Sequence, residues 1–313
     1  MLELDDLIAK LKVIAAQETN PDKHARLQTR LEEFEKRRDN FIDVRYSRLG
    51  AWEEVLLARA EPRPYTLDYI AQIFTGFTEL GGDRRAGQDN AIVAGPALLD
   101  DRPVMVVGHQ KGRDIQQRAY RNFAMSKPEG YRKAIRMFDM AERFRLPVVT
   151  FVDTPAADPG VESESRGISE AIASSMLKMF ELTVPVVSVV IGEGGSGGAI
   201  GIACANKVMM QQHAIYSVIP PEGCAAILWR DPDKGAQAAA ALKLTALSAI
   251  ELELVDEILV EPFGGAHRNP IDAAATVKDA ILRALFDLDN LAPQELKEHR
   301  YQRFRKMGRM QTV

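Results

Sequence analysis

The sequence of 313 residues has only two cysteines, Cys204 and Cys224, and both lie among small apolar residues. Two thiols cannot form a four-ligand zinc site by themselves. We interpret them as buried free thiols of a protein in a reducing compartment. Nor does any spacing of histidine, cysteine and carboxylate residues suggest metal ligands, so the sequence predicts no metal site on this chain.

Long apolar runs and a strong net charge are also missing. No uninterrupted apolar stretch reaches the length that spans a bilayer, and the start, Met1–Asp6, has neither the basic first residues nor the apolar core of a signal peptide. A formal net charge of −4 gives no reason to expect nucleic acid. We therefore expect a cytoplasmic protein that binds neither a membrane nor a nucleic acid.

The first 60 residues are predicted to be helical. Apolar residues recur there at helical spacing, and Asn20-Pro21 breaks the pattern as a helix cap followed by a first-turn proline would. This indicates an N-terminal helical extension, a hairpin, over residues 1–60. Ala60–Tyr65 carries two prolines and predicts an extended linker to the main domain.

From residue 61 to about 265, predicted strands and helices alternate. β-branched apolar runs predict strands, and amphipathic segments predict the helices between them. The strands are expected at 91–95, 103–108, 147–152, 184–191, 207–210, 214–219 and 254–260, and the main helices at 128–145 and 166–181. This order predicts an α/β fold with a largely parallel sheet. Residues 266–313 are predicted to be a C-terminal helical region whose basic residues, from Lys297 to Arg309, lie on a solvated face.

The most informative stretch is Val184–Gly201. It joins a buried apolar strand to five glycines between Gly192 and Gly198 and then to small apolar residues that suit a helix packed on a sheet. A helix N-terminus exposes unpaired backbone N–H groups and partial positive charge. Such a place suits an anion, or a carbonyl oxygen that becomes negative. Close packing alone needs one or two glycines, so five favour a ligand that approaches the backbone.

Three interpretations of this stretch are open. The spacing G-x-G-x-x-G from Gly192 fits a dinucleotide fingerprint, but residues 209–213 lack the acidic residue that should follow. The spacing G-x-S-x-G around Ser196 fits the nucleophile elbow of a serine hydrolase, with Asp256 and His267 following in the required order. The third interpretation is a backbone oxyanion hole in which Ser196 is incidental.

Polar residues also follow other predicted strands, where sites in open α/β sheets form. These candidates for a substrate pocket are Lys111, Arg113, Asp158, Pro159 and Gly160.

Other polar residues give weaker indications. Glu193 is a possible general base or a partner of Lys111 or Arg113, and the lone histidines His109 and His267 are interpreted as structural. No nucleophile and base lie at short range in the sequence. The chemistry that the sequence still supports is therefore stabilisation of an oxyanion, without an obvious acid or base among the side chains.

Several runs of residues strongly resemble the carboxyltransferase α subunit of bacterial acetyl-CoA carboxylase. The resemblance covers nearly the whole chain, and its most specific runs are residues 108–114, 128–134, 192–199, 217–225, 264–270 and 300–303. It implies a crotonase-like ββα-superhelix fold, with the core at 61–265 between the N-terminal hairpin and the C-terminal helices.

The family's activity is implied with the fold. The family's enzyme is an α2β2 carboxyltransferase. It moves the carboxyl group of carboxybiotin, held on a separate carrier protein, to acetyl-CoA and so makes malonyl-CoA for fatty-acid synthesis. Zinc is expected on the β subunit, and ATP is used only by the separate biotin carboxylase. The resemblance implies that the enzyme stabilises two enolate oxygens, of which one is the urea oxygen of biotin. No protein base is needed, because the freed biotin nitrogen can take the methyl proton of acetyl-CoA. The alternative is a stand-alone crotonase-type or serine-type thioester enzyme that uses Ser196.

The resemblance also assigns site residues. It places biotin on the α subunit and the thioester on the β subunit, so the N–H groups of Gly197 and Gly198 are expected to form the oxyanion hole for biotin. The rest of the biotin-binding loop is expected to be Gly194, Gly195, Ser196 and Ala199.

Two positions depart from the family pattern Asp-Thr-Pro-Gly-Ala-Tyr-Pro-Gly. Ala156 replaces the glycine and Asp158 the tyrosine. A methyl group at 156 restricts the backbone, so the change either alters affinity or acyl-CoA choice or is a tolerated surface variation.

Overall fold

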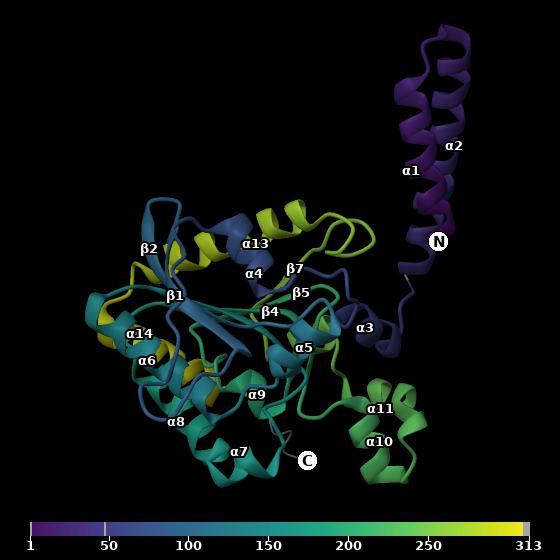
Figure 1. The fold of residues 1–313 in the computed structure, drawn as a ribbon. Coiled ribbons are helices and arrows are strands. Elements are labelled where there is room, and N and C mark those ends of the chain that lie inside the picture. Colours follow the sequence, from purple (N-terminus) through teal and green to yellow (C-terminus); the bar gives the residue numbers. More distant parts are fainter. Residues whose placement is uncertain (1, 47, 309–313) are drawn as a thin grey trace. The chain divides into compact units, whose positions relative to one another are not determined.

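The computed structural model describes residues 2–46 and 48–308 (Figure 1). The chain forms two compact units, of which the first ends at Leu49 and the second begins at Gly50. This division falls before the predicted boundary at residue 60. The reason is helix α3 (Ala51–Ala58), whose Val55 and Ala58 pack with Ile215 and Ala239 of the second unit.

The first unit is a pair of helices, α1 (Leu2–Gln17) and α2 (Pro21–Tyr46). The side chain of Asn20 accepts hydrogen bonds from the N–H groups of Asp22 and Lys23 at 3.1 and 3.2 Å, as a helix cap does. The predicted break at Asn20-Pro21 is therefore present.

In the second unit, the described residues form a sheet of seven strands. The strands are β1 (Ile92–Leu99), β2 (Arg102–His109), β3 (Val148–Thr154), β4 (Val186–Gly195), β5 (Lys207–Gln211), β6 (Ile215–Ser217) and β7 (Glu257–Leu259). Their order is β1-β2-β3-β4-β5-β7, and β6 pairs with the end of β4. Only β1 and β2 are antiparallel, so the predicted α/β fold with a largely parallel sheet is confirmed.

Helices cover both faces of this sheet (Figure 1). On one face α4 (Thr66–Ile73) and α13 (Pro270–Leu288) pack on the strands, and on the other α6 (Pro128–Phe144) and α8 (Ile168–Glu181) do so. Shorter elements complete the unit: α5 (Ile115–Tyr120), η1 (Asn122–Ala124), α7 (Val161–Ser165), α9 (Ser196–Ile200), α10 (Pro221–Trp229), η2 (Pro232–Lys234), α11 (Gly235–Leu242) and α12 (Ala246–Glu251). Among the described residues, no helix is long and apolar enough to cross a membrane.

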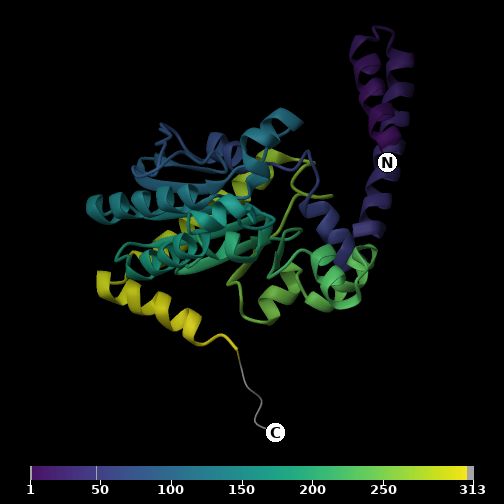
Figure 2. The same ribbon diagram turned by 60° about the horizontal axis from the view of Figure 1, so that its bottom comes forward.

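The basic C-terminal helix α14 (Pro293–Arg305) packs beside α8, at the lower left of Figure 2. The prediction of a solvated basic face was wrong for Arg300, which is fully buried. Its guanidinium donates to the carbonyl oxygens of Met179, Leu182 and Val184 at 2.7 to 3.0 Å. The end of α8 leaves carbonyls without helical partners, and the arginine satisfies them. The predicted position Arg309 lies outside the described residues.

The segment predicted as a linker, Ala60–Tyr65, is exposed at Glu61 and Pro62 but buried from Arg63 to Tyr65. Arg63 is buried and makes two hydrogen bonds with Glu261, at 2.8 and 2.5 Å, and one with the carbonyl oxygen of Ile191 at 2.8 Å. Residues 60–65 therefore tie α3 and α4 to the strand that leads into the glycine segment.

Candidate functional site

The glycine segment is the end of a strand and the start of a helix, not a loop. Gly192–Gly195 are the last four residues of β4, and α9 begins at Ser196. β5 pairs with β4 as far as Val190, and β6 replaces it from Glu193 onward. The segment thus emerges where β4 changes its neighbour, at the carboxyl edge of the parallel strands.

Most of the glycines are required by the chain's own packing. A Cβ atom at Gly192 would stand 2.4 Å from Oδ1 of Asp153, one at Gly195 would stand 1.9 Å from the carbonyl oxygen of Pro155, and one at Gly194 would stand 2.6 Å from the ring of Tyr216. A Cβ at Gly198 would stand 2.5 and 2.6 Å from backbone atoms of Ala156 and Ala157. The interpretation that five glycines exceed what packing needs was therefore wrong for these four.

Gly197 differs from the other four. A Cβ there would meet only the end of the Ile172 side chain, at 3.3 Å. Gly197 and Ser196 line a cavity of about 560 Å³ whose other walls are largely apolar. Those walls include Met176, Phe180, Ile200, Val218, Leu254, Phe304 and Met307.

The first turn of α9 offers backbone donors at this cavity. Within the described part of the chain, the N–H groups of Ser196, Gly197 and Gly198 donate no hydrogen bond outside the helix, and first-turn N–H groups have no partner inside one. Ala199, the fourth residue of the helix, is fully buried. Gly194 and Gly195 lie buried in the sheet. Of the six residues assigned to the loop, Ser196 and Gly197 line the cavity, whereas Gly198 is buried under the peptide between Ala156 and Ala157.

The loop after β3 packs on this turn. The peptide between Ala156 and Ala157 covers Gly198, and Oγ1 of Thr154 donates to the carbonyl oxygens of Ala124 and Ala156 at 2.7 and 2.6 Å. Ala156 does not have a positive φ, so its methyl group causes no backbone strain. The role of this loop as a close neighbour of the glycine turn had no signal in the sequence except its place after a strand.

The remaining loop candidates lie elsewhere. Asp158 accepts a hydrogen bond from Ser163 in α7, and its N–H donates to the carbonyl oxygen of Ser126 at 3.0 Å. Pro159 is exposed, and Gly160 caps the start of α7. These contacts hold the loop in place, and none of them involves Lys111.

Lys111 lies in a cluster of buried charges. Its Nζ is 2.6 Å from Oδ1 of Asp153 and 2.9 Å from Oε2 of Glu193, and Nε of Arg59 is 2.7 Å from Oε1 of Glu193. Burial opposes every one of these charges, but the two carboxylates hold the pKa of Lys111 above its ordinary value. Burial likewise opposes the charge of Glu193, whose pKa Lys111 and Arg59 hold below its ordinary value. The lowered pKa makes Glu193 a weaker base, and both of its oxygens are engaged in ion pairs, so it does not suit a general base.

Arg113 is separated from Lys111 although two residues away in sequence. It pairs with Asp68, its guanidinium carbon lies 3.9 Å from the ring centre of Tyr65, and it donates to the carbonyl oxygen of Arg63 at 2.8 Å. Lys111 lines a cavity of about 280 Å³ with Arg59 and Glu193, whereas Arg113 lines another of about 220 Å³. The predicted substrate pocket of Lys111, Arg113 and residues 158–160 is thus not brought together.

The residues of a serine hydrolase are not assembled either. Ser196 has a φ of +52°, an unfavourable left-handed conformation for a serine and one expected of a strained turn. However, Asp256 binds Arg303 and the N–H of Val208, and the side chain of His267 lies against Gly265. In the described residues no hydrogen bond joins Asp256, His267 and Ser196.

His109 is the histidine closest in sequence to the charge cluster, but it is fully buried. Burial, assisted by the charge of Lys111, lowers its pKa to about 3. It is neutral at physiological pH, which agrees with its interpretation as structural.

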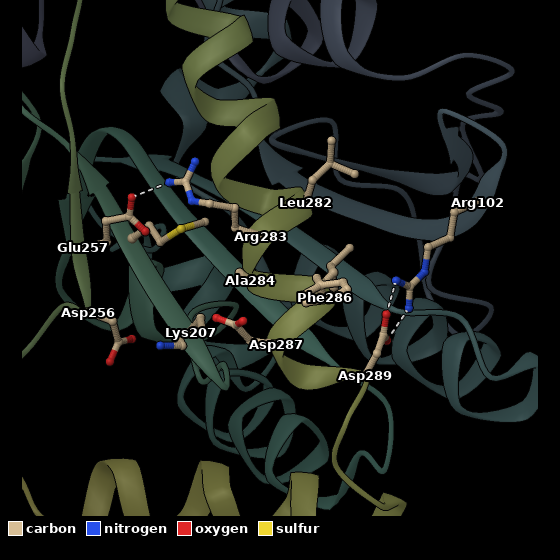
Figure 3. A pocket seen from close by; sticks show the side chains of 12 residues that line it. Arg102, Lys207, Asp256, Glu257, Leu282, Arg283, Ala284, Phe286, Asp287 and Asp289 are labelled. Carbon is tan, nitrogen blue, oxygen red and sulfur yellow. Dashed lines mark hydrogen bonds and ion pairs between the residues drawn. The ribbon is translucent and has the colours of Figure 1, made fainter.

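A larger cavity, of about 700 Å³, lies at the opposite edge of the sheet, where β2, β5 and β7 begin (Figure 3). Its charges neutralise one another: Arg102 pairs with Asp289 at 2.6 Å, and Arg283 pairs with Glu257 at 2.6 Å. The candidate site is the cavity at Ser196 and Gly197, where the first turn of α9 lines the wall.

Solved structures with similar folds are carboxyl-handling enzymes. Transcarboxylase 12S, with hydrolysed methylmalonyl-CoA bound, aligns with a TM-score of 0.60 and 22% identity over 75% of this chain and 44% of its own. The present chain thus spans under half of that enzyme. A Pseudomonas malonate decarboxylase heterodimer aligns with a TM-score of 0.57 and 18% identity over 71% of this chain and 90% of its own. The fold is therefore the crotonase-like fold of such carboxyltransferases, as predicted.

Sequence comparison assigns the chain to one family of carboxyltransferases. The family model for acetyl co-enzyme A carboxylase carboxyltransferase-like proteins matches residues 1–308. The acetyl-coenzyme A carboxylase carboxyl transferase subunit alpha of Geobacter metallireducens is 52% identical over 309 residues, 99% of this chain and 95% of the relative. That of Vibrio vulnificus is 53% identical over 282 residues, 90% of this chain and 88% of the relative. The chain belongs to this carboxyltransferase α-subunit family.

Proposed function

We propose that this chain is the α subunit of an acetyl-CoA carboxylase carboxyltransferase. With a β subunit it transfers the carboxyl group of carboxybiotin to acetyl-CoA and forms malonyl-CoA. The observation that carries the proposal is similarity along 99% of the chain to α subunits of that enzyme. The cavity at the first turn of α9 supplies the kind of site that the reaction needs.

The chain's own contribution is a set of fixed backbone donors. Biotin, when bound, supplies the carboxyl group and the ring nitrogen that carries it. The N–H groups of Gly197 and Gly198, with that of Ser196 beside them, hold the urea oxygen of that ring and stabilise negative charge there. Loss of one such donor costs about 2.7–4 kcal/mol of transition-state stabilisation in a measured precedent.

The residues around Gly197 fit such a ring. Gly197 has room for a ligand at its Cα, because only Ile172 approaches it. The cavity walls, among them Phe180, Ile200 and Val218, suit an apolar ring and aliphatic chain and help exclude water. Donors on one side and apolar walls on the others match a molecule with one polar edge.

The partners are proposed on the relatives' names and the family. A relative named subunit alpha implies a multi-subunit enzyme, and we infer a β subunit that holds the acetyl-CoA thioester in an α2β2 assembly. Biotin then resides on a carrier protein, ATP is consumed by a separate biotin carboxylase, and a zinc ion belongs to the β subunit. We place the enzyme in the cytoplasm, where fatty-acid precursors are made.

Reconstitution tests the function. The α subunit is mixed with the β subunit of the same organism and assayed in reverse, with malonyl-CoA and free biotin as substrates and acetyl-CoA as product. We expect turnover by the mixture and none by either subunit alone. Thioester turnover by the α subunit alone would contradict the proposal and favour a stand-alone enzyme.

A further inference from the structure

The pairing of β3 and β4 is irregular at Asp153. The strands are in register as far as Val152 and Val190, the register then shifts, and pairing resumes between Thr154 and Gly194. Between the two pairings, Asp153 alone of β3 faces residues 191–193 of β4, so β4 carries two extra residues there. Here Oδ1 of Asp153 accepts the backbone N–H of Glu193 at 2.9 Å. A side chain of one strand thus binds the backbone of the next just before the glycine turn.

Lys111 completes this connection. It follows β2, and its single ammonium binds Asp153 at the end of β3 and Glu193 in the glycine end of β4, at 2.6 and 2.9 Å. The two carboxylates are only 2% and 9% exposed. Without the ammonium, two buried carboxylates would face each other, and one would have to move or take up a proton.

The residues that follow on both strands build the donor turn. The carbonyl oxygen of Pro155, two residues after Asp153, stands so close to Gly195 that no side chain fits there, and the Ala156–Ala157 peptide covers Gly198. A change in the distance between the ends of β3 and β4 would therefore move the first turn of α9, because the two are in direct contact.

We propose that Lys111 is a positioning residue for carboxyl transfer. By binding Asp153 and Glu193 together it fixes the end of β3 against the glycine end of β4. In this way it orients the backbone N–H groups of the first turn of α9, from Ser196 to Gly198. This inference rests on the proposed function. The sequence predicted that Lys111 lines the substrate pocket. In the present proposal Lys111 does not touch substrate and acts by holding the glycine turn in place.

The test is Lys111→Met in the α subunit, reconstituted with its β subunit and assayed with malonyl-CoA and biotin. Misplacement of reacting groups by about 1 Å costs about 10²-fold in rate, so we expect kcat to fall by that factor. The KM for malonyl-CoA should change by less than about threefold, because the lost interaction acts in the transition state. The control is Lys278→Met, which removes a lysine that pairs with Asp100 on the surface, at 2.6 Å, and should leave kcat unchanged.

A second substitution separates positioning from folding. In the Lys111→Met chain, Glu193→Gln supplies an amide that can donate to Asp153 and still accept from Arg59, which restores the connection without the ammonium. We expect it to recover at least about tenfold of the lost kcat. Should Lys111→Met fail to fold, Lys111→Gln and the double variant are compared in its place.

Three results would decide against Lys111 as a positioning residue. They are a wild-type kcat in Lys111→Met, a KM that rises while kcat stays constant, and a loss of kcat that follows the melting temperature with no recovery on Glu193→Gln. An inactive wild-type mixture would instead contradict the proposed function.

Discussion

Gly197 and Gly198 are neighbours in different surroundings, so matched substitutions can separate ligand access from packing. A methyl group at Gly198 would stand 2.5 Å from the carbonyl carbon of Ala156 and 2.6 Å from the nitrogen of Ala157. Carbon contacts are comfortable at about 3.5–4.0 Å, so the peptide must retreat by about 1 Å. Overpacking of this kind costs about 1–3 kcal/mol. We expect Gly198→Ala to lower the free energy of unfolding by that amount.

Gly197→Ala should be tolerated by the fold. Its methyl group meets only the flexible end of Ile172, at 3.3 Å, and its φ is not positive. Replacing a helical glycine gains about 0.5–1 kcal/mol, so the free energy of unfolding should not fall. Activity should fall all the same, because the side chain narrows the approach to the N–H donors. The ceiling is the loss of one donor, about 10²–10³-fold in kcat, and we expect Gly197→Val to come closer to it than Gly197→Ala.

Urea unfolding of the α subunit and the reverse assay of the reconstituted enzyme measure the two effects. The expected pattern is a stable but slower enzyme for Gly197→Ala and a destabilised chain for Gly198→Ala. Full turnover by a stable Gly197→Val chain would refute the assignment of the Gly197 N–H to the site. Native stability of Gly198→Ala would refute the packing of the Ala156–Ala157 peptide on the turn.

Three further substitutions test other parts of the reasoning. Ser196→Ala should keep most of the carboxyltransferase activity in the reverse assay, because none of the bases in the described part of the chain binds the hydroxyl; complete loss would favour a serine nucleophile. Arg63→Met leaves Glu261 buried without its partner and should lower the urea-derived free energy of unfolding by about 3–5 kcal/mol, part of which Glu261→Gln should restore. Burial opposes the charge of Glu261, but Arg63 holds its pKa below the ordinary 4.5, so the stability that this pair contributes is present above pH 4.5 and is lost as the pH falls further; a wild-type chain as stable at pH 3 as at pH 7 would contradict this. Arg300→Met strands the carbonyl groups at the end of α8 and should cost at least about 1–3 kcal/mol, seen as a lower melting temperature; an unchanged one would show that water replaces the guanidinium.

The sheet could be predicted from sequence because its signals are local. β-branched runs bounded by proline or glycine mark β3 and β4, and their alternation with amphipathic segments indicates parallel pairing. The register shift of β4 opposite Asp153 and the exchange of β5 for β6 beside β4 could not be predicted. Both depend on register between strands that are distant in sequence, which no local pattern specifies.

Among the charged residues, too, local patterns could be predicted and contacts with distant segments could not. A run of basic residues normally marks a solvated face, and the prediction for the C-terminal helix followed that rule. Arg300 departs from it because the carbonyls it binds belong to the end of α8, and Arg63 is buried because its carboxylate partner, Glu261, lies far along the chain. Burial of an arginine is decided by partners that the sequence around it does not contain.

The glycine segment shows why residue type alone leaves a site undecided. The absence of a Cβ allows close approach, but the approaching group can be the chain itself or a ligand, and the sequence is the same in both cases. For Gly192, Gly194, Gly195 and Gly198 the group is the chain itself. The contacts of Gly192, Gly195 and Gly198 bring the end of β3 and its loop against the glycine segment, that of Gly194 brings β6 against it, and Gly197 is left at the cavity. On the proposed function, the four packing glycines and Gly197 act together. The four fix the turn so that the N–H of Gly197 can meet a ligand without reorganisation, which is what makes a backbone donor effective in catalysis.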